Sequence, residues 1–329
     1  MIGLSGEERM IMTIDEIQTI IRRILANPFG IEFNILVMDD EVLTLHHLNI
    51  GQGDTYNRIV GQYVQVLKED FLSNEDSISV QDLYNIDQRK DVFYQVGDVS
   101  SIPRLNAMND LLFANEIGSA NHPQLSYSKI WGFVITLGND SESIILFKKH
   151  YPMNTLKQNV FLLRFINDAF SLVDNETNIR FDTEFHCFFL GGNWFVKDLK
   201  IFEKYFQFTE IEIQKAYTTF QSIVDLNLMQ ADQALLTACL GKRAIARKIL
   251  RIVSSSQVLA RGISNERILA FSKEFEAYKG KFSYSPDNKI ILSTQKDFNL
   301  YLKLMNDDYL VSELTDAVYD TEVKIPEVV

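Results

Sequence analysis

The stretch KIWGFVITLGNDSESIILFKK, residues 129–149, is the most β-like part of this 329-residue chain. Two apolar runs, 129–137 and 143–148, are separated by Gly138-Asn139-Asp140, a sequence typical of a tight turn. The stretch therefore predicts a β-hairpin, and we expect a sheet to be built around it.

Further strands are predicted on both sides of this hairpin. Apolar runs at 33–37 and 42–48 are separated by a polar turn and predict a second hairpin. Single strands are predicted at residues 91–96, 179–181, 185–190 and 194–196. Apolar residues at helical spacing predict amphipathic helices at residues 14–25, 59–72 and 199–206.

Helices dominate the chain from Glu210 onward. They are predicted at residues 211–228, 231–240, 242–253 and 264–278, and Gly241 and Gly280 are suited to end helices. A strand, turn and strand follow at 282–292, an order that a winged helix also shows. We predict an α+β fold with two domains: a β-rich sheet domain over residues 1–208 and a mostly helical domain with a hairpin over 209–329.

Composition favours a protein of a reducing compartment. Cys187 and Cys239 are the two cysteines in the sequence, too few for a disulfide-stapled secreted scaffold. The first residues do not have the pattern of a secretory signal. The longest apolar runs are much shorter than the roughly 20 residues that a membrane-spanning helix needs. We expect a cytoplasmic protein without direct membrane insertion.

Charge is distributed unevenly along the chain. The net charge is -12, yet residues 240–281 carry 10 Lys and Arg against 3 Asp and Glu. A helical wheel of residues 242–253 places Ile245, Ile249, Ile252 and Val253 on one side. It places Arg243, Arg247, Lys248 and Arg251 on the other side. We therefore expect one face of this helix to pack and the other to be cationic.

Clustered basic side chains are the electrostatic signature of phosphate contact. We predict that the segment binds DNA without sequence specificity through Lys242, Arg243, Arg247, Lys248, Arg251, Arg261, Arg267, Lys273, Lys279 and Lys281. A solvated helix face, or one docked on the acidic N-terminal part of the chain, explains the same pattern. An acidic protein partner is another alternative, and anionic lipid ranks last because the helix lacks an aromatic apolar face.

Catalytic and metal-binding motifs are weak. Gly241-Lys242 lacks the earlier glycine of a phosphate-binding loop, and no spaced set of His and Cys predicts a metal site. One arrangement resembles a Mg²⁺-dependent nuclease: Asp182, then Asp198 and Lys200. N-capping of the helix at 199–206 is the simpler interpretation of Asp198. We predict no cofactor, no metal site and no catalytic residues, and keep the nuclease as the alternative.

The central and C-terminal sequence resembles the KwaB family of the Kiwa anti-phage defence system. The resemblance rests on 145–152 (ILFKKHYP), Asp182, 193–197 (NWFVK) and 201–206 (IFEKYF), and it continues through 248–250 and 290–292 into 298–318. It extends over roughly residues 90–320. These are structural patterns and not catalytic signatures.

The resemblance implies a bacterial cytosolic protein that binds DNA. It also implies a complex with KwaA, an integral membrane partner that would recruit the protein to the inner face of the cell membrane. This complex would block phage replication and late transcription, and the family implies a homodimer. Since the family supplies no catalytic residues for this sequence, obstruction without catalysis is the expected mechanism.

Overall fold

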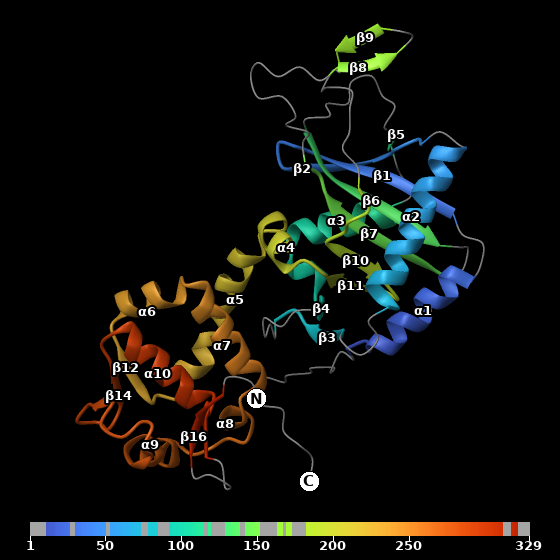
Figure 1. The fold of residues 1–329 in the computed structure, drawn as a ribbon. Coiled ribbons are helices and arrows are strands. Elements are labelled where there is room, and N and C mark those ends of the chain that lie inside the picture. The colour runs from blue at the N-terminus through green and yellow to red at the C-terminus, as the bar shows by residue number, and fades with distance from the viewer. Residues whose placement is uncertain are drawn as a thin grey trace. The chain divides into compact units, whose positions relative to one another are not determined.

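The hairpin predicted at residues 129–149 lies near the middle of a large sheet (Figure 1). Its strands β6 (Ile130–Gly138) and β7 (Ser143–Lys149) pair antiparallel, with Ile135 opposite Leu146. In the described part of the chain this sheet has nine strands, in the order β3-β4-β11-β10-β7-β6-β1-β2-β5. The prediction of a sheet built around this hairpin is confirmed.

The computed structural model describes residues 11–26, 30–50, 53–73, 78–84, 92–114, 118–119, 129–138, 142–151, 163–166, 169–172, 182–311 and 317–321. The chain divides into two units, each with its own hydrophobic core. Unit 1 comprises residues 1–83 and 89–207, and unit 2 comprises residues 84–88 and 208–329. The strand predicted at 179–181 lies outside the described residues.

The remaining strands of the sheet flank the central hairpin. On the β6 side, β1 (Gly30–Asp39) and β2 (Val42–His47) form the second predicted hairpin. On the β7 side, the antiparallel strands are β10 (Cys187–Leu190), β11 (Asn193–Val196) and β4 (Val92–Gln95). The edge strands β3 (Ser79–Asp82) and β5 (Gly118–Ser119) run parallel to their neighbours. A separate pair consists of β8 (Leu163–Ile166) and β9 (Ala169–Leu172).

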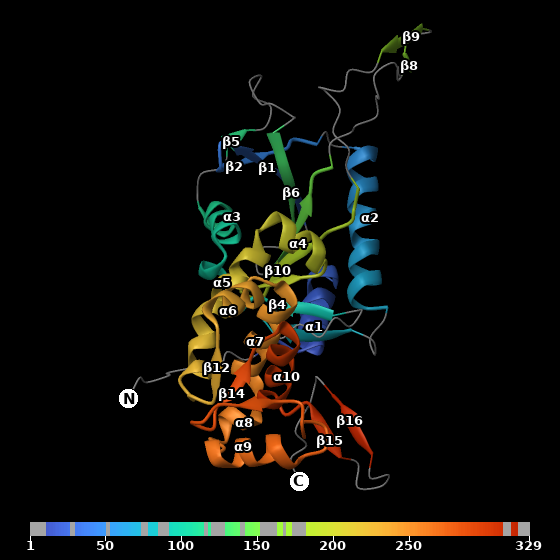
Figure 2. The same cartoon turned by 90° about the vertical axis from the view of Figure 1, so that its left-hand side faces the viewer.

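Helices cover both faces of the sheet of unit 1 (Figure 2). On one face lie α1 (Ile14–Ala26) and α2 (Asp54–Phe71); on the other lie α3 (Pro103–Phe113), after the short η1 (Val99–Ser101), and α4 (Leu199–Tyr205). Side chains alternate along a strand. Phe133, Ile135 and Leu137 therefore share one core with α1 and α2.

A β-bulge near the start of β6 interrupts the alternation of its side chains between the two faces of the sheet. Leu36 pairs with Gly132 and Val37 with Ile130, so that Trp131 is the extra residue. A bulge redirects the side chain of the inserted residue. Trp131 accordingly packs against Phe206, next to α4, with ring centroids 5.3 Å apart.

Unit 2 contains the predicted helices and hairpin of the C-terminal region. Its helices are α5 (Phe208–Val224), α6 (Gln233–Leu240), α7 (Arg243–Ser255), α8 (Gln257–Ala260), α9 (Asn265–Glu274) and α10 (Gln295–Met305). Its strands are β12 (Met229–Ala231), β13 (Ser283–Tyr284), β14 (Ile290–Leu292), β15 (Tyr309–Val311) and β16 (Val318–Asp320). The α+β prediction is confirmed.

Two details of unit 2 differ from the sequence prediction. The helix predicted to reach Tyr278 ends at Glu274, because Phe275 adopts an extended conformation with ψ 130°. The strand β12 was not predicted, and it pairs parallel to β14, so that a three-stranded sheet replaces the simple hairpin. A three-residue strand is too short to give a periodic signal in the sequence.

We expect Gly132→Ala to destabilise unit 1. A Cβ at this position would lie 2.7 Å from a ring carbon of Phe147 and 2.8 Å from the carbonyl oxygen of Lys148. Relief of such a clash in a packed sheet costs about 1–3 kcal/mol. Urea unfolding followed by circular dichroism measures this change.

Gly61→Ala is the matched control, since Gly61 lies on α2 and an added Cβ meets no atom within 4 Å among the described residues. Replacing a helical glycine by alanine stabilises by roughly 0.5–1 kcal/mol. If both variants shifted the unfolding midpoint in the same direction, the packing described for Gly132 would be wrong.

Candidate nucleic-acid interface

The basic segment Lys242–Lys281 folds as α7, α8 and α9, followed by turns. The hydroxyl of Ser256 caps α8 by accepting from the backbone N–H groups of Val258 and Leu259. Ser264 caps α9 by accepting from the N–H of Arg267, as the sequence predicted. The starts of α8 and α9 are thus each fixed by a serine that immediately precedes the helix, whereas α7 follows Lys242 without a side-chain cap.

The apolar side of α7 packs as the helical wheel predicts. Ile245, Ile249 and Ile252 are buried in the core of unit 2. The cationic side differs from the prediction, because the side chains of Arg247 and Lys248 are only 14% and 13% exposed. These two cations are turned toward acids of the same unit.

Glu212 of α5 binds two of the predicted DNA-binding residues. Its carboxylate is buried and lies 2.9 Å from Nε of Arg247 and 3.6 Å from Nε of Arg243. Burial raises the pKa of Glu212, and the hydrogen bond and charge of Arg247 oppose this rise. A buried carboxylate is tolerated where a cation compensates its charge, as Arg247 does here.

Asp308 binds a third cation of α7. The carboxylate of Asp308 is fully buried, accepts from Nζ of Lys248 at 2.8 Å, and accepts from Nδ2 of Asn306 at 2.5 Å. This ion pair joins α7 to the segment that follows α10. Arg251, one turn beyond Arg247, is partly buried as well.

The predicted cationic face of α7 is therefore corrected. Arg247 and Lys248 stabilise unit 2 internally, and half-exposed Arg243 shares the carboxylate of Glu212. These acids belong to unit 2 and not to the acidic N-terminal part of the chain. A helical wheel cannot detect them, since Glu212 and Asp308 are distant in sequence.

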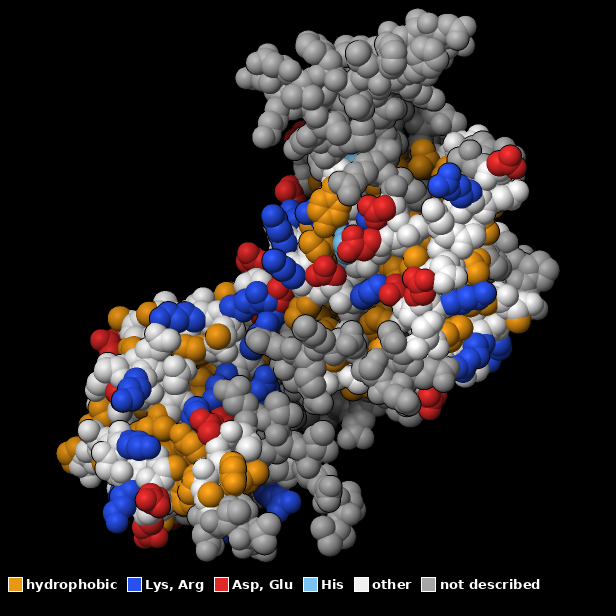
Figure 3. Space-filling view, in the orientation of Figure 1, with side chains coloured by type: hydrophobic (Ala, Val, Ile, Leu, Met, Phe, Trp, Pro, Cys, Tyr) orange, Lys and Arg blue, Asp and Glu red, His pale blue; other side chains and the backbone are white. Residues whose placement is uncertain are grey.

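Six of the predicted cations are exposed on unit 2, namely Lys242, Arg261, Arg267, Lys273, Lys279 and Lys281. Figure 3 shows Lys and Arg side chains spread among apolar, uncharged and some acidic side chains over the elements that Figure 1 labels α6, α9 and β14. Lys273 lies over the ring of Tyr284 at 4.8 Å and donates to Asn288. The basic segment thus presents dispersed cations and not one continuous stripe.

The structure gives the three residues of the nuclease alternative separate roles. Asp198 caps α4 by accepting from the N–H of Ile201, which confirms the N-cap interpretation. Asp182 binds Lys148, and Lys200 is exposed on α4. Within the described residues, no hydrogen bond or ion pair joins Asp182, Asp198 and Lys200.

Two structural features are absent from the described residues. No group of three or more His, Cys, Asp and Glu side chains is placed there to hold a metal ion. Among the same residues, no helix has the length and apolar character needed to span a bilayer.

Comparison with known proteins identifies the family. The profile of a family described as Kiwa protein KwaB-like matches residues 127–315, more than half of the chain. The chain belongs to the KwaB-like family. It is also 24% identical over 315 residues to Kiwa protein KwaB of Escherichia coli O55:H7 (strain RM12579 / EPEC), covering 94% of this chain and 97% of that protein. No solved structure shows a significant match.

Membership in the KwaB-like family makes the chain a component of the Kiwa anti-phage defence system. The matched residues include the central hairpin of unit 1 and the basic segment of unit 2. The family resemblance expected from residues 145–152 and the later patterns is confirmed.

The KwaB-like region also contains a buried lysine that sequence analysis missed. Lys148 is 2% exposed, is hydrogen-bonded to Asp182, and lies 3.9 Å from Glu184. The sequence held a signal for this position: Ile144, Leu146 and Lys148 alternate along β7 and therefore share the core face. A lysine on a core face requires an acidic partner, and here Asp182 supplies it.

Two buried histidines lie close to Lys148. Burial lowers the pKa of His186, with nearby acids opposing and Lys148 adding to the effect; burial and then Lys148 lower the pKa of His150. Neither ring nitrogen of His186 has a hydrogen-bond partner among the described residues. Both side chains are therefore neutral core residues at neutral pH.

We expect Asp308→Ala to destabilise unit 2 by about 3–5 kcal/mol, because it leaves Lys248 partly buried without its partner. Thermal unfolding measured by circular dichroism tests this expectation. Glu276→Ala is the matched control, since it also removes an acid of unit 2 but from an exposed position. Equal losses in the two variants would contradict a structural role for the Lys248–Asp308 pair.

The two buried histidines predict a pH dependence of the stability of unit 1. The pKa values of both histidines are lower in the folded than in the unfolded protein. Their contribution to the free energy of unfolding is therefore complete above the unfolded pKa of about 6.5, and it is lost as the pH falls from 6.5 through the folded pKa values. We expect the thermal midpoint to fall on acidification and to fall less in a His150→Gln/His186→Gln variant. His47→Gln, at an exposed position, should keep the wild-type dependence; a double variant with the wild-type slope would contradict the prediction.

Proposed function

We propose that this KwaB-like protein binds duplex DNA without reading its sequence, through the exposed cations of unit 2. One observation carries the proposal: Lys242, Arg261, Arg267, Lys273, Lys279 and Lys281 stay exposed after the internal ion pairs of α7 are accounted for. The same segment exposes three acids, Glu266, Glu274 and Glu276, so that six cations against three acids leave a local net charge of +3.

Dispersed cations suit phosphate contact better than base reading. Lysine and arginine that contact phosphates release counterions and fix the position of the duplex, whereas sequence is read by side chains that enter a groove. The chain as a whole carries a net charge of -12. Attraction to DNA is therefore expected at a locally basic surface such as this one, and not evenly over the whole protein.

We further propose that the protein acts as part of a larger assembly. The resemblance to KwaB implies a homodimer and a KwaA-like integral membrane partner that recruits it to the inner face of the membrane. DNA held in such an assembly would be withdrawn from replication and late transcription by obstruction. Family membership supports this context.

A Lys279→Ala/Lys281→Ala variant tests the DNA contact. Each lost phosphate contact should reduce the magnitude of the slope of log K against log salt by about 0.9. The magnitude for the double variant should therefore be smaller than that of the wild type by up to about 1.8. Fluorescence anisotropy with one labelled duplex over a salt series measures the slope. Arg243 and Arg247 are unsuitable for such a test, because their loss leaves Glu212 without its partners.

Lys200→Ala/Lys204→Ala is the matched control, because it removes two exposed lysines from unit 1. Its slope should equal that of the wild type. An unchanged slope in the Lys279/Lys281 variant would show that the DNA contact lies elsewhere. Adding Mg²⁺ should leave the duplex intact on a gel. Nicking abolished by Asp198→Asn, which keeps an N-cap side chain for α4, would favour the nuclease instead.

A further inference from the structure

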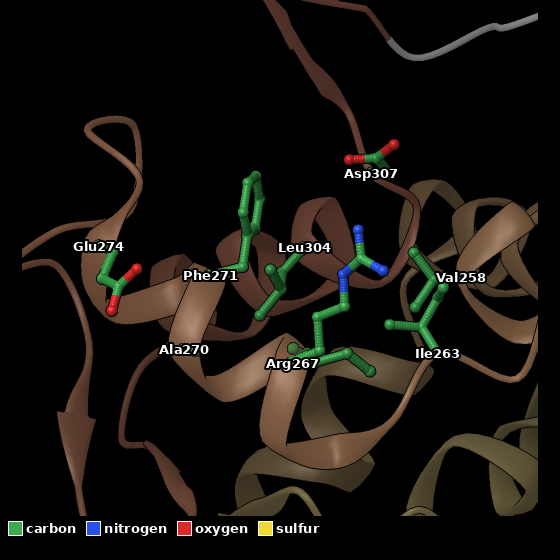
Figure 4. A pocket seen from close by; sticks show the side chains of 9 residues that line it. Val258, Ile263, Arg267, Ala270, Phe271, Glu274, Leu304 and Asp307 are labelled. Carbon is green, nitrogen blue, oxygen red and sulfur yellow. The ribbon is translucent and has the colours of Figure 1, made fainter.

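A pocket of about 370 Å³ opens on unit 2 among α8, α9 and the end of α10 (Figure 4). Val258, Ile263, Ile268 and Leu304 supply apolar lining. The other lining residues are Ala270, Phe271, Arg267, Glu274 and Asp307. A volume of this size lies within the range of about 300–1,000 Å³ typical of small-ligand sites.

One side of the pocket is an aromatic ring held by other rings. Phe271 is 36% exposed and stacks on Phe275, with centroids 4.6 Å apart and planes 17° apart. Tyr278 contacts both rings and stacks in turn on Phe282. The ring of Phe271 is therefore the exposed end of a fixed aromatic series, and a planar ligand can stack on it without the cost of ordering it.

Arg267 supplies a cation beside this ring. It lies one helical turn before Phe271 on α9, and in Figure 4 its guanidinium points into the space between Phe271 and Val258. Its side chain is exposed and makes no hydrogen bond or ion pair with another described residue. An anionic group of a ligand would pair with this guanidinium.

We infer that the pocket takes an unpaired nucleotide of single-stranded DNA, with its base stacked on Phe271 and its phosphate bound by Arg267. A flat apolar ring joined to a phosphate matches an aromatic ring beside an arginine. In duplex DNA the base faces are covered by neighbouring bases, so the pocket is specific for unpaired strands. This inference rests on the proposed DNA binding and deepens it.

An acid of the pocket sets a preference among bases. Glu274 and Asp307 repel a phosphate placed next to them, but the carboxylate of Glu274 can accept a hydrogen bond from an exocyclic amino group. Cytosine carries such an amino group and thymine carries a carbonyl oxygen at the same ring position. The pocket should therefore favour cytosine over thymine in strands of equal length.

Binding of oligo(dC), oligo(dT) and a mixed-sequence duplex to the full-length protein tests the inference. Strands of about 15 nucleotides are long enough for one site. Phe271→Ala should weaken oligo(dC) binding by roughly 5- to 150-fold, the loss expected for one stacked base, and should change duplex affinity less than about 2-fold. Phe271→Trp should retain strand binding, and oligo(dC) should bind more tightly than oligo(dT).

Phe113→Ala is the matched control, because Phe113 of unit 1 is also an exposed phenylalanine in contact with another ring. It should leave strand affinity unchanged. Phe271→Leu should weaken strand binding as Phe271→Ala does, because it removes the stacking ring but keeps an apolar side chain, and this keeps the test valid if Phe271→Ala unfolds. Arg267→Gln should weaken strand and duplex binding together, because Arg267 is also one of the exposed cations proposed to contact duplex DNA. Thermal midpoints of all variants identify any unfolding.

Several outcomes would overturn the inference. If Phe271→Ala and Arg267→Gln bound oligo(dC) as the wild type does, the pocket would not be the binding site of an unpaired nucleotide. If salt-dependent duplex binding were retained at the same time, the proposed function would still hold. An equal loss of strand and duplex binding in Phe271→Ala would refute selectivity for unpaired strands. Binding of dCMP as tightly as oligo(dC) would assign the pocket to a free nucleotide, and absence of all DNA binding would refute the proposed function as well.

Discussion

The buried carboxylate of Glu212 constrains the architecture of unit 2. A charge removed from water must be compensated locally, and Arg247 and Arg243 of α7 lie within reach. Lys248 satisfies the same requirement for Asp308 after α10. These pairs fix the rotation of α7 about its own axis, since its cations must face two acids while Ile249 and Ile252 face the core. The cations that remain exposed are those that the buried acids do not use.

Local patterns made much of the fold predictable. The hairpin at 129–149 combines β-forming runs with a turn sequence, and the apolar side of α7 follows from helical spacing alone. Both signals extend over a few residues. The bulge at Trp131 was not predictable in this way, because it depends on the pairing of β6 with β1, a strand far away in the sequence.

The candidate site was predicted less well, for a related reason. The basic character of 242–281 is a property of composition, but exposure depends on partners 35 residues away for Arg247 and 60 residues away for Lys248. The sequence KKHY at 148–151, which contributes to the family resemblance, likewise has a structural role. Lys148 and His150 are buried, and Lys149 lies 4.6 Å and 4.7 Å from the ring centres of Tyr151 and Tyr205.

Tyr84 belongs to unit 2 although the strands on both sides of it in the sequence belong to unit 1. Its ring lies 3.4 Å below Nζ of Lys215 and contacts Phe208, both on the first helix of unit 2. A polypeptide that starts at Phe208 would lack this ring and leave an apolar side chain uncovered. Fragments 1–207 and 208–329, produced as separate polypeptides, would thus have a specific reason to reassociate, as in fragment complementation.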